Sequence, residues 1–375
     1  MNSSQPSTLP KGQGAKLKIA LVGCGKAADL HVSEIGKLLS VQLVAVCDSE
    51  PLMAEQLAVR YGIAKPYSDF DAMLSAERPD VVHITTPPNS HLSLAIQALD
   101  AGCHVMVEKP LALDAAQAGQ LLAHATKCER KLTVGYTYYF DPIVQKLRSF
   151  VQEGVMGEAV HLESFFGYNL KGPFGTPIFA DSEHWVHKLP GGLLQNVLDH
   201  LLNKIIEFVP DENPSVSVRS WQGSRDLPHI DYELLDELRV MVAGEKVSAN
   251  AVFSSHARPV RHALVFHGTR NTAHLDFISG TITLQPNSSL PGVLGRLANP
   301  FQQSWQHFRQ GGKNIWRFAR SDYQSFAGFQ ALIAAFYQSI LQDTPPPIAY
   351  REILRVSTLM DEVTQKLHRV EVAER

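Results

Sequence analysis

Cysteine is scarce in this sequence and is never arranged for metal or disulfide chemistry. The 375 residues include four cysteines, and no two of them stand in a Cys-x-x-Cys spacing. This absence disfavours a disulfide framework and a zinc site, so we predict no metal centre. Free thiols are typical of a reducing compartment, and we therefore expect a cytoplasmic protein.

Long hydrophobic runs are missing as well. No stretch approaches the roughly 20 consecutive apolar residues that a membrane-spanning helix needs. Residues 1–15 are polar and contain Gly, Pro and Ser where a signal peptide would have its apolar core. We expect this segment to be a disordered tail.

A strong net charge is the third absence. Lysine and arginine number 34 against 37 acidic residues, which gives a formal net charge of −3. Nucleic-acid-binding proteins usually carry a basic excess, so we do not expect nucleic acid as a partner. The length exceeds that of one ordinary core and predicts two domains.

Acidic residues are absent from residues 277–321, where basic and aromatic residues are interleaved. The simplest interpretation is a helical insertion at about 286–322 whose aromatic side chains pack on its own domain or on a neighbouring subunit. The alternative is an anionic partner, either a sugar-nucleotide phosphate or a membrane surface contacted through 290–322. The basic residues are Arg296, Arg309, Lys313, Arg317 and Arg320.

A glycine turn follows the first apolar segment, residues 17–22. The pattern is G-x-G-x-x-A, in which the first glycine permits the turn and the second lets backbone approach a pyrophosphate. The small third residue lets the following helix pack on the strand, and the helix N-terminus favours a phosphate. We expect the cofactor to be bound by Gly23, Gly25, Lys26, Ala27 and Ala28.

An acid stands where such a fold binds ribose. Asp48 ends the β-prone segment 42–47, and a carboxylate at about this distance from the turn takes the ribose hydroxyls. The same residue would also suit the N-cap or turn before a helix at 51–61. No Lys or Arg lies close by in the sequence to neutralise a 2′-phosphate, so NAD is favoured over NADP.

Strand-like and helix-like segments then alternate as far as residue 134, which predicts βαβ units and a doubly wound parallel sheet. Polar clusters follow the segments 81–85, 104–107 and 132–134. In such a sheet these clusters meet at the carboxyl ends of the strands, where ligands bind. Later β-prone segments between 214 and 285 predict an antiparallel sheet.

Three motifs in order carry a resemblance: the G-x-G-x-x-A turn, Thr86-Pro87-Pro88-Asn89 with His91, and the segment Ala101 to Pro110 ending in Glu-Lys-Pro. Together they resemble the Gfo/Idh/MocA oxidoreductases, the family of glucose–fructose oxidoreductase and inositol dehydrogenase. The resemblance implies further cofactor contacts at Thr86, Pro87, Asn89, His91, Glu108 and Lys109.

After the tail at 1–15, the resemblance implies an α/β architecture. It has a nicotinamide-binding Rossmann domain at 16–138, an α+β domain at 139–350 and a C-terminal helix at 351–375 that packs back on the Rossmann domain. In the family the second domain has a large, mostly antiparallel open sheet that often mediates assembly. A homo-oligomer, either a dimer or a tetramer, is therefore expected.

Lys109 is the first candidate for catalysis. It follows an apolar strand and precedes Pro110, which fixes its backbone at the edge where ligands bind. An arbitrary lysine is usually a solvated surface residue, but the flanking residues and the strand end favour a functional role. In the family this lysine is catalytic, and the bond to the proline is often cis.

His200 is the second candidate. It lies on a helical segment where residues 196, 199, 200 and 203 share a face, and the family uses the matching histidine as acid and base. Asn196 stands where the family has an aspartate that supports this histidine. An amide orients the ring without stabilising its cation, so we expect activity to titrate near or below about pH 6.5. Asp199 could instead turn inward.

The substrate pocket is expected to involve residues from three segments. Tyr138 and Tyr139 follow the third polar cluster, and the family often has an arginine where Tyr139 stands. An irregular aromatic loop at 168–189 offers further contacts, although such a loop is as often a packed lid. The candidates are Tyr138, Tyr139, His184, Trp185 and Asn203.

These residues predict an NAD-dependent oxidoreductase that moves a hydride between nicotinamide and a carbon of a sugar, polyol or activated sugar. Lys109 would polarise the substrate oxygen and His200 would exchange its proton. Two alternatives remain open at this point: a redox-neutral enzyme of the NAD-dependent glycosidase type, and a non-catalytic protein that senses NAD.

Overall fold

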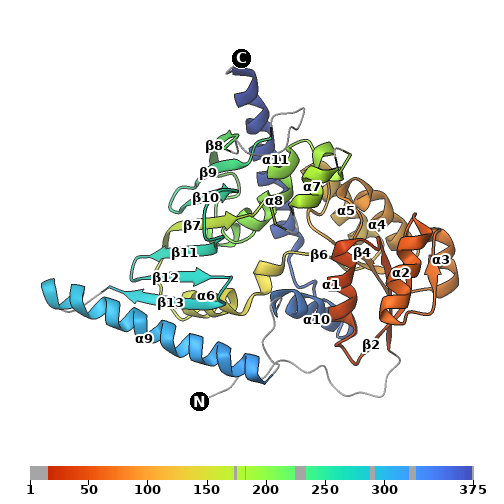
Figure 1. Cartoon of the computed structure of the whole chain (residues 1–375), viewed down its shortest axis with the longest axis horizontal. Coiled ribbons are helices and arrows are strands. Elements are labelled where there is room, and N and C mark those ends of the chain that lie inside the picture. The colour runs from red at the N-terminus through yellow and green to blue at the C-terminus, as the bar shows by residue number, and fades with distance from the viewer. Residues whose placement is uncertain are drawn as a thin grey trace. The chain divides into compact units, whose positions relative to one another are not determined.

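The computed structural model describes residues 16–172, 175–181, 183–223, 234–287, 292–320 and 327–373. The chain forms two compact units (Figure 1). The first unit comprises residues 1–135 and 329–357, and the second comprises 136–328 and 358–375. Residues 329–350, expected in the second domain, thus group with the first unit. Of the C-terminal helix expected to pack back on the Rossmann domain, residues 351–357 group with the first unit and the remainder with the second.

The first unit is built on a six-stranded parallel sheet in the order β3-β2-β1-β4-β5-β6. This order, with its reversal beside β1, is that of a dinucleotide-binding fold. The strands are β1 (Leu17–Val22), β2 (Val41–Cys47), β3 (Pro66–Tyr67), β4 (Val81–Ile84), β5 (His104–Val107) and β6 (Leu132–Val134).

The central strands of this sheet are mostly apolar, because helices cover both faces. Ile19, Leu21, Val81 and Val105 are completely buried. The helices of this part of the chain are α1 (Lys26–Ile35), α2 (Pro51–Tyr61), α3 (Phe70–Glu77), η1 (Pro88–Ser90), α4 (His91–Asp100), α5 (Ala115–Lys127), α10 (Ala327–Leu341) and α11 (Tyr350–Ala373), which continues into the second unit.

Local signals in the sequence fix several helix ends. Asp69 and Asp114 cap α3 and α5 by accepting hydrogen bonds from the backbone N–H groups of Ala72 and Gln117, each at 2.7 Å. Gly62 ends α2 in the left-handed conformation, with φ of +67°.

The second unit contains a seven-stranded, mostly antiparallel sheet in the order β13-β12-β11-β7-β10-β9-β8. Only the β7–β10 pair is parallel among these neighbours. The strands are β7 (Ala159–Gly167), β8 (Ser215–Trp221), β9 (Glu237–Ala243), β10 (Ser248–Ser254), β11 (His262–Gly268), β12 (Asn271–Asp276) and β13 (Thr281–Pro286). The two sheets confirm the predicted fold class.

Helix α8 lies against β7 and β10, and the long helix α9 lies along the edge strand β13 (Figure 1). The buried side of α8 is apolar and includes Leu194, Leu198 and Leu201. The helices of this unit are η2 (Thr137–Phe140), α6 (Pro142–Gln152), α7 (Thr176–Ala180), η3 (Trp185–Lys188), α8 (Gly192–Leu202), η4 (Ile206–Phe208) and α9 (Gly292–Ala319).

Two expectations about the chain's surface can now be compared with the structure. Among the described helices, none is long and apolar enough to cross a membrane. Within the insertion expected at about 286–322, residues 292–319 form a helix. Phe301, Trp305 and Phe308 are exposed, so these side chains do not pack on their own domain, whereas packing on a neighbouring subunit stays a prediction.

Candidate active site

The glycine turn between β1 and α1 can hold only glycine at its first position. Gly23 has φ of +95°, and a Cβ there would lie 2.6 Å from the backbone nitrogen of Thr86. The Thr85 hydroxyl anchors the turn by donating to the carbonyl oxygens of Val22 (3.1 Å) and Gly23 (2.5 Å). The turn is therefore packed directly against the loop that follows β4.

Gly25 is open where Gly23 is crowded. A Cβ at Gly25 would meet no atom within 4 Å. Gly25 is also the N-cap of α1, and no side chain caps this helix end. The open space, the helix N-terminus and the tight turn together fit a bound pyrophosphate, with Lys26, Ala27 and Ala28 forming the first turn of the helix.

The Asp48 carboxylate lies beside this turn. Its Oδ2 accepts a hydrogen bond from the backbone N–H of Cys24 at 2.6 Å, and its Oδ1 accepts one from that of Glu50 at 3.0 Å. The N-cap of α2 is Glu50, so Asp48 makes a turn before the helix without capping it. Its contact with the glycine turn fits the predicted ribose-binding acid.

The loop after β4 is held from behind by His91. This buried side chain has its two ring nitrogens 2.8 Å from the carbonyl oxygen of Thr86 and 2.9 Å from that of Pro110. Burial lowers the pKa of His91, although these backbone contacts oppose the shift. His91 therefore ties the Thr86-Pro87 loop to the Glu-Lys-Pro loop. Asn89 lies in η1, within the same connection.

Glu108 ends a chain of buried hydrogen-bonding groups. Its Oε1 lies 2.8 Å from Nε2 of His31, whose Nδ1 lies 2.7 Å from Nδ1 of His83. Nε2 of His83 lies 2.8 Å from the hydroxyl of Tyr337 on α10. Burial, and then the charge of His31, hold the pKa of His83 well below its ordinary value. The row of hydrogen-bonding contacts is therefore continuous from Tyr337 to Glu108.

The row of hydrogen-bonding side chains that ends at Glu108 helps to keep this carboxylate ionised beside Lys109. Burial raises the pKa of Glu108, but the hydrogen bond from His31 and the charges of His31 and Lys109 outweigh it and lower the pKa. Oε2 of Glu108 accepts a hydrogen bond from the backbone N–H of Lys109 at 3.0 Å. The Lys109–Pro110 bond is cis. Glu108 thus fixes the backbone of the candidate catalytic lysine at the end of β5.

In the second unit, His200 lies on the partly exposed side of α8. The same side carries Asn196, one turn earlier. Asp199 is buried, and its Oδ1 accepts a hydrogen bond from the backbone N–H of His200 at 2.8 Å while lying 3.9 Å from ring Nδ1. Asp199 has therefore turned inward. Asn203 is buried as well, at the C-terminal end of the helix.

Aromatic rings surround His200. The Tyr138 ring meets it edge to face at 5.7 Å, and the Phe166 ring lies 4.9 Å away. The Tyr138 hydroxyl lies 3.3 Å from Nδ1 of His262. Burial, followed by the charges of Asp141 and Asp199, raises the pKa of Tyr138, so Tyr138 remains a neutral phenol. The sequence placed Tyr138 and His200 at one site, and the structure brings them into contact.

Lys204 is the residue of this site that the sequence did not indicate. Its side chain is completely buried in the aromatic cluster of Tyr138, Phe166 and Phe277, with Nζ 4.9, 5.9 and 5.2 Å from the three ring centres. Among the described residues, its hydrogen bond is to the carbonyl oxygen of Phe165, at 3.4 Å. Burial lowers the pKa of Lys204 to about 7. Its position four residues after His200 was the one signal in the sequence that could have placed Lys204 near this site.

The buried amine makes stability depend on pH. Lys204 titrates near pH 7 in the folded chain but near 10.5 when unfolded, so the unfolded state binds more protons between these values. Folding stability therefore rises with pH across this window, by about 1.4 kcal/mol per pH unit at most. We expect Lys204→Met to be more stable than wild type at pH 7 and to lose this advantage towards pH 10.5.

Urea unfolding at several pH values measures this difference. Lys146→Met is the matched control, because Lys146 lies 4.4 Å from the centre of the Phe150 ring but is exposed. A stability difference between Lys204→Met and wild type that stays constant with pH would show that Lys204 does not titrate in this window.

The remaining substrate candidates lie on separate elements of the second unit. Tyr139 is stacked under the guanidinium of Arg148, at 4.0 Å, and its carbonyl oxygen accepts a hydrogen bond from Arg148 at 2.7 Å. One face of the Tyr139 ring is therefore already covered by Arg148. His184 begins η3 by accepting a hydrogen bond from the backbone N–H of Val186, and its ring lies 5.5 Å from that of Trp185. The loop at 168–189 therefore contains a short ordered turn.

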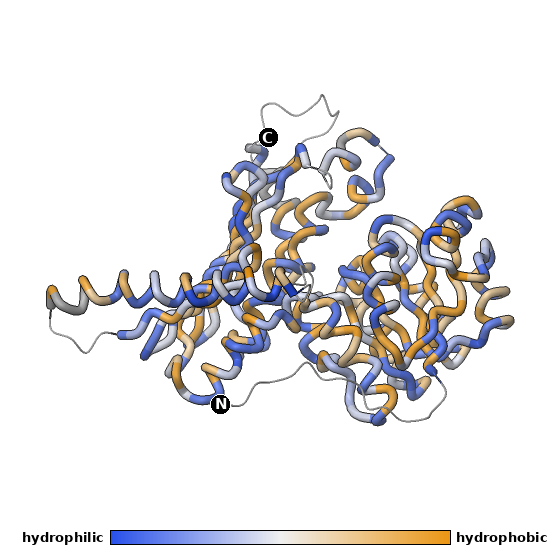
Figure 2. Tube along the Cα trace, turned by 60° about the horizontal axis from the view of Figure 1, so that its bottom comes forward, coloured by the Kyte–Doolittle hydropathy of each residue, from blue (hydrophilic) through white to orange (hydrophobic). Residues whose placement is uncertain are grey.

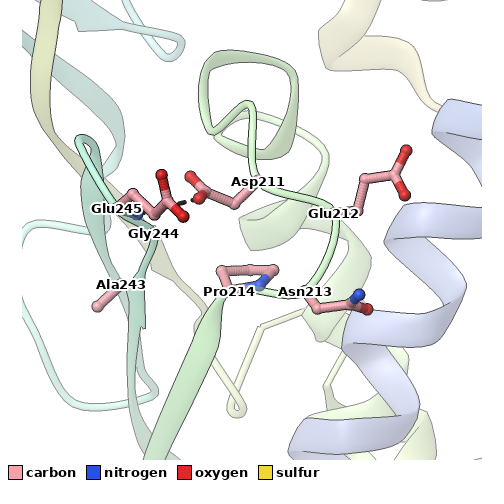
Figure 3. Close-up of a pocket in the computed structure, with 7 residues that line it drawn as sticks. All are labelled: Asp211, Glu212, Asn213, Pro214, Ala243, Gly244 and Glu245. Carbon is pink, nitrogen blue, oxygen red and sulfur yellow. Dashed lines mark hydrogen bonds between the residues drawn. The ribbon is translucent and has the colours of Figure 1, made fainter.

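Two other features contain no predicted site residue. A surface pocket of about 430 Å³ is lined by acidic and turn residues, among them Asp211, which accepts a hydrogen bond from the backbone N–H of Glu245 (Figure 3).

Among the described residues, Asp100, His124 and Cys128 could reach a common ion. Nε2 of His124 lies 2.8 Å from Oδ1 of Asp100, so an ordinary side-chain hydrogen bond accounts for the proximity of these two groups.

Comparison with known proteins confirms the resemblance. Residues 17–136 match the GFO_IDH_MocA oxidoreductase family, described as an NAD-binding Rossmann fold. The chain is 36% identical over 188 residues to D-glucoside 3-dehydrogenase of Escherichia coli (strain K12), an alignment that covers 50% of this chain and 52% of that protein. It is 32% identical over 171 residues to D-apiose dehydrogenase of Paraburkholderia graminis, covering 46% of each. The chain thus spans about half the length of these curated relatives.

Solved structures share the fold over nearly the whole chain. The WlbA dehydrogenase from Bordetella pertussis, solved with NADH and UDP-GlcNAcA, has a TM-score of 0.72 and 16% identity, covering 94% of this chain and 96% of that one. At this level of identity the likeness concerns the fold alone. It extends the comparison beyond the Rossmann region to the second sheet.

Proposed function

We propose that this chain, a member of the Gfo/Idh/MocA family through residues 17–136, is an oxidoreductase that transfers a hydride between NAD and a carbinol carbon of a sugar or polyol. One observation carries the proposal. The glycine turn, the Thr86 loop and Lys109 follow the ends of β1, β4 and β5, which are neighbours in one parallel sheet. This is the edge where a doubly wound sheet binds its ligand.

Bound nicotinamide would supply the hydride acceptor or donor. The residues that would hold the cofactor are Gly23 and Gly25 at the pyrophosphate and Asp48 at the ribose. The open space at Gly25 and the contact of Asp48 with the turn support this assignment. Asp48 also favours NAD over NADP, because a carboxylate there repels a 2′-phosphate.

Lys109 is assigned to the substrate oxygen. An ammonium hydrogen-bonded to that oxygen stabilises the negative charge that develops when the hydroxyl loses its proton or the carbonyl gains a hydride. Ionised Glu108, bonded to the Lys109 backbone, holds the loop at the end of β5. A fixed donor costs little reorganisation during the reaction.

His200 is assigned to the proton. In the oxidative direction it accepts the hydroxyl proton, and in the reductive direction it returns one. The neutral amide of Asn196 adds no charge that would stabilise an imidazolium, and the cation of Lys204, one turn away in the same aromatic cluster, opposes it. The buried carboxylate of Asp199, whose Oδ1 lies 3.9 Å from Nδ1 of His200, acts in the opposite direction and favours the imidazolium.

Relatives support a sugar-type substrate, since their names include D-glucoside 3-dehydrogenase and D-apiose dehydrogenase. A panel of methyl glycosides, free aldoses, inositol and UDP-sugars tests the proposal, with NADH absorbance as the signal. We expect turnover with NAD and at least one member, and a kcat/KM with NADP at least about tenfold lower, because one charge-assisted hydrogen bond is worth that much.

Asp48→Ala should reduce this preference for NAD, whereas Glu55→Gln, on the exposed side of α2, should leave it unchanged. Tight NAD binding without turnover on the whole panel would contradict the proposed reaction. Equal use of NAD and NADP by the wild type would contradict the role of Asp48 alone.

A further inference from the structure

Helix α9 is amphipathic, and its polar side faces its own domain. The side-chain amide of Gln306 pairs with both the N–H and the carbonyl oxygen of Leu284, each at 2.8 Å. Gln310 pairs in the same way with Ile282, at 2.7 and 2.6 Å. Because β13 is the outermost strand of the sheet, these amides satisfy the backbone groups of an edge that would otherwise be unpaired.

Asn314 extends this row by donating to the carbonyl oxygen of Ser279 at 2.7 Å. Residues 306, 310 and 314 are spaced by four and share one face of the helix. The helix is therefore bound to the sheet edge through hydrogen bonds, and the exposed side chains of Phe301, Trp305 and Phe308 are not used to hold it there. Figure 1 shows α9 running along β13.

The opposite side of α9 is hydrophobic and exposed. At 100° per residue, Phe301, Trp305 and Phe308 lie within about 40° of the direction opposite Gln310. Their exposed fractions are 78%, 60% and 73%. Further large apolar side chains on this helix are exposed: Val293, Leu297, Ile315, Trp316 and Phe318. Hydrophobic and hydrophilic residues alternate along the helix in Figure 2.

Basic residues border this hydrophobic side, and no acid accompanies them. Arg309, Lys313 and Arg320 are exposed along one flank, and Arg320 stacks on Trp316 at 3.9 Å. No Asp or Glu occurs between residues 277 and 321. Two copies of α9 packed face to face would bring these cations together with no carboxylate on either helix to pair them. The charge pattern therefore favours an anionic partner over a second copy.

We propose that α9 is a docking helix for the surface of an anionic phospholipid bilayer. A lipid surface suits both parts of the pattern. The aromatic and aliphatic side chains enter the boundary between headgroups and acyl chains, where Trp is favoured, and Arg309 and Lys313 meet the headgroup phosphates. The helix lies in the plane of the surface and does not cross it.

Vesicle flotation with the full-length protein tests this. We expect the wild type to float with vesicles of phosphatidylcholine and phosphatidylglycerol, to float less with phosphatidylcholine alone, and to be released by salt. The triple variant Phe301→Ser, Trp305→Ser, Phe308→Ser should lose at least tenfold in partitioning, since three large apolar groups no longer insert. Arg309→Gln with Lys313→Gln should weaken binding to the anionic vesicles only.

The matched control is Leu52→Ser with Val59→Ser on α2, which removes two other exposed apolar side chains (63% and 85%). It should float like the wild type. Because the substituted α9 side chains are also exposed, thermal unfolding should confirm that the triple variant is folded. Emission from Trp305 and Trp316 should shift to the blue on adding anionic vesicles.

Two results would overturn the proposal. One is equal flotation of the wild type and the triple variant. The other is a wild type that does not float with the vesicles and is a dimer by light scattering, while the triple variant is a monomer. The hydrophobic side of α9 would then be an interface between copies of this chain. Neither result depends on the proposed oxidoreductase activity, which is measured separately.

Discussion

Lys109→Met should lower kcat by about three orders of magnitude while leaving NAD affinity within a few fold. The substitution keeps the length of the side chain but removes the ammonium assigned to the reacting oxygen, and loss of one such donor costs about 10²–10³ in kcat. Lys109→Arg should not restore turnover, because the guanidinium is larger and planar and does not place its donors where the ammonium does. Stopped-flow NADH absorbance measures the chemical step, and fluorescence titration measures NAD binding.

Lys127→Met, at the exposed end of α5, is the control and should behave like the wild type. If Lys109→Met instead raised KM alone at unchanged kcat, Lys109 would contribute binding energy without stabilising the transition state. Loss of NAD binding together with activity would show that the substitution had damaged the loop.

His200→Gln should lower kcat by about 10²–10⁴, the range for removing a general acid–base group. Glutamine fills the site and keeps hydrogen-bonding capacity, but it cannot exchange a proton near neutral pH. The pH–rate profile gives a second readout. Asn196→Asp should move the acidic limb of the wild-type profile to higher pH, because a carboxylate one turn away favours the imidazolium.

An Asn196→Asp profile identical to the wild type would show that residue 196 does not act on the titrating group. A His200→Gln enzyme that keeps the wild-type rate and the acidic limb would remove His200 from the reaction. Phe208→Leu is a useful comparison for packing effects, since Phe208 follows α8 on η4 and has no proton to exchange.

The sequence predicted the Rossmann sheet well because its signals are local. The glycine turn, the short apolar strands and the caps of the helices each lie within a few residues of one another. Gly23 is the clearest example: the motif requires glycine at this position, and the structure shows the positive φ that only glycine adopts readily. Asp48 was likewise predicted from its distance to the turn, and its carboxylate accepts a hydrogen bond from the turn at Cys24; its binding of ribose stays a prediction.

Long-range contacts could not be predicted in the same way. The aromatic cluster around Lys204 combines Tyr138, Phe166 and Phe277, which meet only through the packing of η2, the register of β7 and the end of β12. A lysine is usually exposed, so nothing in the composition indicates that Lys204 is buried. The chain from Glu108 through His31 and His83 to Tyr337 also joins four distant segments.

Helix α9 shows a third case. Its hydrophobic pattern was visible in the sequence, and a pattern of this kind normally marks the side that packs on the protein. The structure reverses this because Gln306 and Gln310 match the spacing of the β13 backbone groups. The contacts with β13 are needed to show that the polar side of α9 faces its own domain.

Transfer of deuterium is the most direct test of the central claim. A substrate from the panel that supports turnover is labelled with deuterium at the carbinol carbon and incubated with the enzyme and NAD. We predict that the label appears at C4 of NADH, on one face of the ring, and that Lys109→Met abolishes the transfer. Exchange of the label with solvent, or turnover that leaves the cofactor unlabelled, would contradict hydride transfer to NAD.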